Sequence, residues 1–87
     1  MKVAVWDTYV SREDGKLMHF DIVVPDYIKN ESIVFGFGET YLKNKPFKTG
    51  SITSKECQFC HMEKAPNNIV SEIKVKGYYI IEMEYCN

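Results

Sequence analysis

The sequence has no excess of one charge, no long apolar run and few cysteines, and each shortage excludes a class of protein. Its 87 residues carry 11 basic and 12 acidic side chains, so no net charge favours a nucleic acid or an anionic membrane. No segment approaches the about 20 consecutive apolar residues that a transmembrane helix requires. We therefore expect neither a nucleic-acid partner nor a membrane-inserted protein.

The amino terminus, M-K-V-A-V-W-D-T-Y-V, also lacks the apolar segment and the small-residue cleavage site of a secretory signal. We expect a cytoplasmic protein for that reason. Its three cysteines cannot all pair within one chain, and in a reducing compartment cysteines serve more often in metal binding or catalysis than in disulfides. A chain of this length is expected to fold as one domain, residues 1–87, around a small core.

Hydrophobic periodicity predicts four strands and two helices in the order ββαβαβ. The strands are expected at residues 2–10, 17–24, 48–53 and 78–85, and the helices at residues 30–43 and 66–76. A strand, helix, strand succession most simply forms a right-handed parallel crossover. The predicted fold is therefore an α+β two-layer sandwich, with one mixed four-stranded sheet and two helices.

The pair Asp14-Gly15 predicts a hairpin between the first two strands. If these two residues form the whole turn, Tyr9 lies opposite Phe20, and Thr8 lies opposite Asp21. A slip of one residue would reverse which faces of the two strands coincide.

Gly36 and Gly38 interrupt the apolar stripe of the first predicted helix, and each costs about 1 kcal/mol relative to alanine in a helix interior. The sequence G-F-G lacks the third glycine and the preceding strand of a dinucleotide-binding fingerprint. We therefore expect both glycines to allow close packing of this helix on the sheet rather than to bind a phosphate.

The segment E-C-Q-F-C-H-M-E holds two cysteines three positions apart and a histidine directly after the second. Thr53 and Glu56 precede the cysteines with the spacing of a capping box. A helical turn that starts there would place Cys57, Cys60 and His61 on one face. The spacing therefore predicts three potential ligands that point the same way.

A parallel crossover would bring Cys86 to the same edge of the sheet, so Cys57, Cys60, His61 and Cys86 form a candidate zinc site, with His19 as an alternative fourth ligand. Tetrahedral zinc sites favour thiolate and imidazole ligands. A second Cys-x2-Cys pair is absent. The alternative is that the cysteines bind no metal and pack as small apolar side chains.

Two other uses of the cysteine pair stay open. A Cys-x2-Cys pair at a helix start can hold a thiolate of lowered pKa, which makes Cys57 or Cys60 a candidate redox thiol. Cys-x2-Cys-His is also the attachment sequence of covalent haem. Haem attachment would need export to an oxidising compartment, and the missing signal argues against it. No cofactor is certain, and zinc is expected before haem.

His19 and Asp21 form a second group, because they share one face of the second predicted strand. Such a pair can serve as a base and the residue that orients it. Asp7 lies on an otherwise apolar face of the first strand. No nucleophile has a defined relation to these residues, so we expect structural polar groups and keep Asp7, His19 and Asp21 as a further candidate site.

Several of these motifs together resemble a known family. They are W-D-T-Y-V, D-G-K-L-M-H-F-D, S-K-E-C-Q-F-C-H and the ending G-Y-Y-I-I-E-M-E-Y-C-N. In combination they are similar to the small bacterial family called domain of unknown function 2024, over nearly the whole chain. The resemblance implies a small α/β domain and assigns no activity to any residue.

The sequence predicts a structural or binding module with a Cys/His cluster rather than an enzyme, and a thiol-redox protein is the alternative. Six tyrosines, five phenylalanines and one tryptophan exceed what so small a core must bury. The excess predicts an aromatic surface that is available for self-association into a homo-oligomer.

Overall fold

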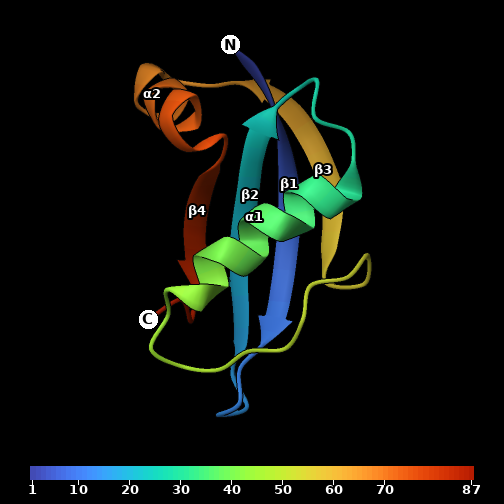
Figure 1. The fold of residues 1–87 in the computed structure, drawn as a ribbon, viewed down its shortest axis with the longest axis vertical. Coiled ribbons are helices and arrows are strands. Elements are labelled where there is room, and N and C mark those ends of the chain that lie inside the picture. Colours follow the sequence, from blue (N-terminus) through green and yellow to red (C-terminus); the bar gives the residue numbers. More distant parts are fainter.

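The computed structural model describes residues 1–87 and contains four strands and two helices in the order ββαβαβ (Figure 1). The strands are β1 (Lys2–Ser11), β2 (Leu17–Pro25), β3 (Cys57–Lys64) and β4 (Tyr79–Glu84). The helices are α1 (Glu31–Lys43) and α2 (Asn67–Lys76). The prediction of an α+β domain with four strands and two helices is confirmed.

The sheet has the order β3-β1-β2-β4, and every neighbouring pair is antiparallel. The expected mixed sheet is therefore wrong. The helix α2 does not return the chain to the side of β3. It crosses the end of the sheet, so that β3 and β4 form opposite edges and run along different central strands (Figure 1).

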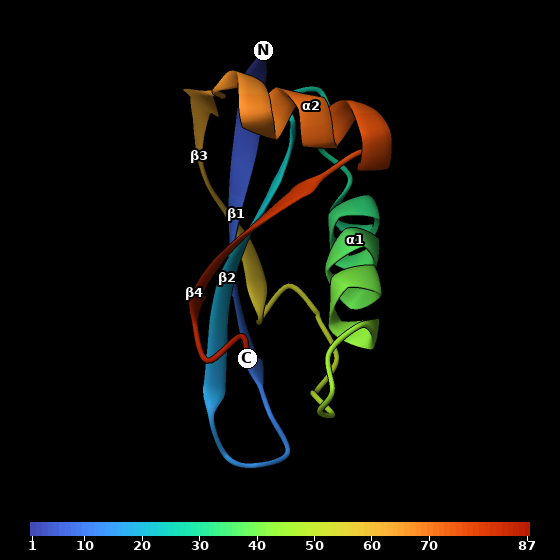
Figure 2. The same ribbon diagram turned by 90° about the vertical axis from the view of Figure 1, so that its left-hand side faces the viewer.

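The two faces of the sheet are covered unequally. Helix α1 lies along one face (Figure 2), where Val34 and Leu42 join a core with Phe20, Ile22 and other buried residues. Helix α2 lies across one end of the molecule (Figure 2). Its Ile73 packs with a small group of residues of the opposite face, namely Val3, Val5, Val23 and Ala65. The rest of that second face has no helix over it.

The hairpin between β1 and β2 has a different register from the one predicted. Thr8 lies opposite Phe20, and Asp7 lies opposite Asp21. The physical reason is the turn: Arg12 N–H donates to the carbonyl of Lys16 across a loop longer than two residues, and Gly15 adopts a φ of 88°. A left-handed glycine at the end of a three-residue loop is a common hairpin closure. Consequently, the face of β1 that carries Asp7 coincides with the face of β2 that carries His19 and Asp21.

The third strand was expected at residues 48–53, and that position is wrong. The Thr53–Glu56 capping interaction does form, since Thr53 N–H and its hydroxyl both donate to Glu56 Oε1. It closes a single turn, after which β3 begins at Cys57. The cysteine segment is therefore a strand at the edge of the sheet and not a helical turn.

The two glycines of α1 differ. A Cβ at Gly38 would lie 2.5 Å from Ile52 Cδ1 and 2.9 Å from Ile22 Cδ1, so the expected close packing is found there. Gly36 has open space around the same position, and close packing does not explain it. At the end of α2, Gly77 adopts a φ of 91° and its N–H donates to Ile73, as the sequence predicts.

Arg12 ties the chain end to the hairpin. Its Nη1 donates to the carbonyls of Tyr85 and Asn87, at 2.9 and 2.7 Å, and its guanidinium lies 3.7 Å from the centre of the Phe47 ring. These contacts hold Cys86 against the main core.

Neither helix of the protein has the length and apolar character that crossing a bilayer requires.

Candidate functional site

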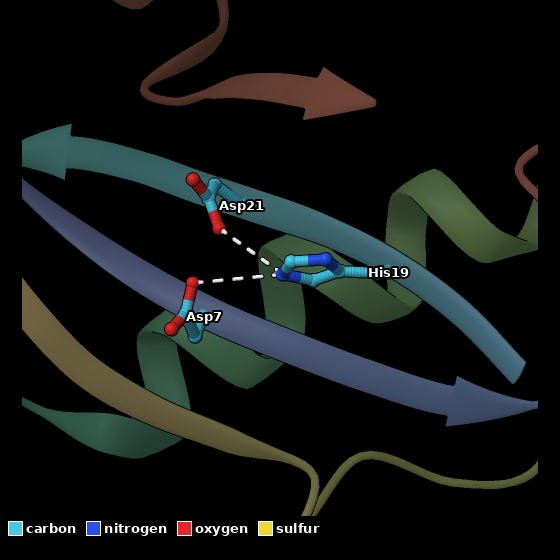
Figure 3. Close-up of side chains that lie close together, drawn as sticks. All are labelled: Asp7, His19 and Asp21. Atoms are coloured by element: carbon cyan, nitrogen blue, oxygen red, sulfur yellow. Dashed lines mark ion pairs between the residues drawn. The ribbon is translucent and has the colours of Figure 1, made fainter. Parts of the chain in front are cut away.

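Three polar side chains meet on the uncovered part of the second sheet face. Asp7 comes from β1, and His19 and Asp21 come from neighbouring positions of the same face of β2. Figure 3 shows one nitrogen of the His19 ring directed at both carboxyl groups, with the helical ribbon behind the strands. The hairpin register causes this arrangement, because it places Asp7 directly opposite Asp21.

The spacing of the three groups is wider than that of hydrogen-bonded partners. His19 Nε2 lies 3.7 Å from Asp7 Oδ1 and 3.9 Å from Asp21 Oδ1, beyond the usual range of a hydrogen bond. One ligand atom from each residue lies within 4.8 Å of the other two. The three atoms therefore surround a point without bonding to one another.

Two of these atoms are buried without a hydrogen-bond partner, namely His19 Nε2 and Asp21 Oδ1. The Asp21 side chain is only 8% exposed, whereas that of Asp7 is 41% exposed. Buried polar groups are nearly always hydrogen-bonded, and each exception calls for an explanation. The unpartnered atoms thus mark this cluster as more than a surface arrangement of polar groups.

The electrostatics of the cluster are those of a crowded carboxylate pair. Burial raises the pKa of Asp21 from 3.8 to about 6, a hydrogen bond with Asp7 and the negative charge of Asp7 add to the rise, and the charges of His19 and His61 oppose it. The ionised pair has two negative charges with little solvent beside Asp21.

The orientation of His19 is fixed by its neighbour on β1. The rings of His19 and Tyr9 are stacked, with centroids 4.1 Å apart and planes at 9°. Stacking on Tyr9 restricts rotation of the imidazole, so Nε2 stays directed at the two carboxyl groups (Figure 3).

Cys60 and His61 lie beside this cluster. Val5 pairs with His61 and Trp6 pairs with Phe59, so Cys60 is the extra residue of a bulge in β3. Its thiol lies 3.2 Å from His61 Nδ1. Desolvation raises the pKa of Cys60, and the charge of Asp7, a hydrogen bond with Asp7 and the charge of Asp21 raise it further. Cys60 and Asp7 line the same open hollow at this edge of the sheet.

Cys57 and Cys86 lie elsewhere. Cys57 is fully buried on the α1 side of the sheet, where the Thr8 hydroxyl donates to its sulfur at 3.3 Å, and burial raises its pKa. Cys86 follows β4 at the opposite edge and donates to the His19 carbonyl at 3.4 Å. The fold thus does not gather Cys57, Cys60, His61 and Cys86, because β3 and β4 are not parallel neighbours.

All three members of the polar cluster were selected from the sequence as candidates, but their proximity in the fold was not predicted. Asp7 was expected on the face shared with Phe20, away from His19 and Asp21. The signal that places it correctly is the alternative hairpin register, in which Trp6, Phe20 and Ile22 share one face and Asp7, His19 and Asp21 share the other.

Comparison with known proteins confirms the resemblance in the sequence. The family model described as domain of unknown function (DUF2024) matches residues 1–83. The NMR structure of protein NE1680 from Nitrosomonas europaea is 38% identical and covers 100% of both chains, with a TM-score of 0.81. No curated protein matched the chain. The fold and the match over nearly its full length together show that this chain belongs to the DUF2024 family.

Proposed function

We propose that the domain is a metal-binding module that holds one divalent cation, with zinc as the expected ion, between Asp7, His19 and Asp21. One observation carries the proposal: three ligand atoms converge within 4.8 Å of one another, and two of them are buried without a hydrogen-bond partner. A bound cation would give both atoms the partner they lack.

The spacing of the ligand atoms supports this. Metal bonds of about 2.1 Å in a tetrahedron hold their ligand atoms about 3.4 Å apart. His19 Nε2 lies 3.7 and 3.9 Å from the two carboxylate oxygens. Movements of a few tenths of an ångström therefore bring His19 Nε2 to the distance from each carboxylate oxygen that a shared ion requires.

The charges favour a cation as well. Two carboxylates that face each other repel when both are ionised, and burial makes this repulsion stronger at Asp21. A divalent cation would neutralise both. Binding must displace the proton of Asp21, so we expect metal affinity to fall as the pH drops through about 6.

The thiols fit redox catalysis less well than binding. A reactive cysteine needs a lowered pKa and an accessible sulfur. The pKa of Cys57 is raised by burial, and that of Cys60 is raised by desolvation and by Asp7. Neither thiol has the positive surroundings that stabilise a thiolate, so the metal-free protein has no evident nucleophile.

The test is native mass spectrometry and isothermal titration with zinc, on protein purified without chelator. We expect one zinc per chain near neutral pH, and loss of that binding in Asp7→Asn and Asp21→Asn. The matched control is Asp26→Asn, which removes an aspartate outside the cluster and should bind normally. Equal zinc binding by all four proteins, or none by the folded wild type, would refute the proposal.

A further inference from the structure

We propose that the Cys60 thiolate is the fourth ligand of this cation, which makes the site selective for a thiophilic ion such as zinc over magnesium or manganese. This inference rests on the proposed metal site. It assigns to the bulge of β3 the task of completing the site from the neighbouring strand.

The bulge explains how Cys60 reaches the cluster. Residues on either side of it pair with Val5 and Trp6 of β1, and Cys60 itself has no partner in that ladder. Bulges re-aim single side chains and occur often beside functional sites. Here the extra residue is a cysteine, and Cys60 and Asp7 are two of the residues that line one open hollow of about 370 Å³.

The contacts of the thiol direct it toward the metal ligands. Cys60 and Asp7 line the same open hollow, and the negative charges of Asp7 and Asp21 act on the Cys60 thiol. Cys60 is exposed and without a disulfide, so rotation about its χ1 can carry Sγ from its contact with His61 toward an ion held by Asp7.

Binding replaces the S–H bond of Cys60 with a bond from sulfur to the metal. The thiol proton leaves, and His61 Nδ1, which lies 3.2 Å from Sγ, is placed to accept it and pass it to water. A coordinating thiol is deprotonated by the charge of the ion itself. The charge of the ion would offset the repulsion between the Cys60 thiolate and the carboxylates, which otherwise raises the pKa of Cys60.

The ligand set decides the metal. Two carboxylates and one imidazole alone suit several divalent ions, whereas a thiolate favours zinc and disfavours magnesium and manganese. Four protein ligands would also close the tetrahedron, as in structural zinc sites, and leave no open position for a catalytic water. Such a site fits a binding or structural module.

His61 is the alternative fourth ligand, because it pairs with Val5 of β1, two positions before Asp7. Its Nε2 lies 3.5 Å from Glu63 Oε1, outside the cluster of Asp7, His19 and Asp21. The experiment must therefore separate the sulfur of Cys60 from the imidazole of His61.

Cobalt(II) distinguishes the two, since its spectrum reports a tetrahedral site in the visible range and a thiolate ligand in the near ultraviolet. We expect both signals in the wild type. Cys60→Ser should keep the visible bands and lose the charge-transfer band, while His61→Asn and Cys57→Ala keep both. We also expect Cys60→Ser to bind zinc at least about tenfold more weakly, with little change for manganese.

The outcomes that overturn the inference differ from those that overturn the metal site. Visible bands without a charge-transfer band in the wild type would leave the Asp7, His19 and Asp21 site in place and remove Cys60 from it. Loss of the visible bands in His61→Asn would assign the fourth position to His61. No spectrum at all in the folded wild type would refute the site and the inference together.

Discussion

The electrostatic account of Asp21 predicts that asparagine at this position stabilises the metal-free protein at neutral pH. The side chain is 8% exposed, and its pKa is raised from 3.8 to about 6 by burial and by Asp7. Asparagine keeps the shape of the carboxyl group and carries no charge. Asp21→Asn therefore removes the charge that the folded state disfavours.

The magnitude follows from the difference between the two pKa values. A shift of about 2 units at 1.36 kcal/mol per unit corresponds to about 3 kcal/mol at pH 7, and this is an upper value. Between pH 4 and 6 the folded protein keeps the proton of Asp21 while the unfolded chain loses it. The folded state binds more protons at Asp21 in that interval, so the contribution of Asp21 to stability falls as the pH rises.

The assay is urea denaturation with an excess of chelator, followed by the fluorescence of Trp6, which is buried in the main core. We expect Asp21→Asn to match the wild type near pH 4 and to exceed it by about 2 to 3 kcal/mol at pH 7 to 8. Asp7→Asn should give a smaller gain by relieving Asp21. If the difference in the free energy of unfolding between Asp21→Asn and the wild type does not grow between pH 4 and 7, this reasoning is refuted.

Two further predictions concern packing and thiol accessibility. Gly38→Ala should lower the free energy of unfolding by about 1 kcal/mol because of its contact with Ile52, whereas Gly36→Ala should raise it by about 0.5 to 1 kcal/mol. Thermal denaturation of both variants measures these changes, and equal effects of the two substitutions would contradict the prediction. Timed alkylation read by mass spectrometry should label exposed Cys60 first, with Cys57 and Cys86, both buried, labelled only on unfolding.

How much of the fold follows from sequence depends on the range of the interactions. Local signals were sufficient for the first two strands, both helices, the last strand and the Gly77 cap. Pairing between distant segments was not, because a strand-helix-strand succession permits either a parallel crossover or a strand at the far edge. The residues of α2 do not decide between these two arrangements. The position of the last strand depends on which edge of the β1–β2 hairpin is already occupied.

The third strand was missed for a different reason. The capping box at Thr53 and Glu56 is genuine, but a box satisfies donors at the start of one turn and does not extend a helix. After it, seven of the eight residues of β3 are exposed, and the bulge at Cys60 interrupts the alternation of apolar and polar side chains that would reveal a strand. Its pairing with β1 is made largely by the backbone.

The candidate site depended on one residue of register. The members Asp7, His19 and Asp21 can be selected from the sequence as polar residues in strands, and the hairpin itself is strongly signalled. Whether Asp7 faces Asp21 depends on the conformation of Gly15. Turn type is the least certain part of such a prediction, and here it decides which side chains meet.

The close spacing of the three cluster residues along the chain has a kinetic consequence. All of them lie between residues 7 and 21, within a single hairpin, and hairpins of this kind form in about 1 to 10 μs. The ligands can therefore converge before β3 and β4 dock, so a cation would be captured early and Cys60 would join afterwards. Zinc should then accelerate refolding in stopped-flow measurements, and a metal that acted only by slowing unfolding would contradict this order of events.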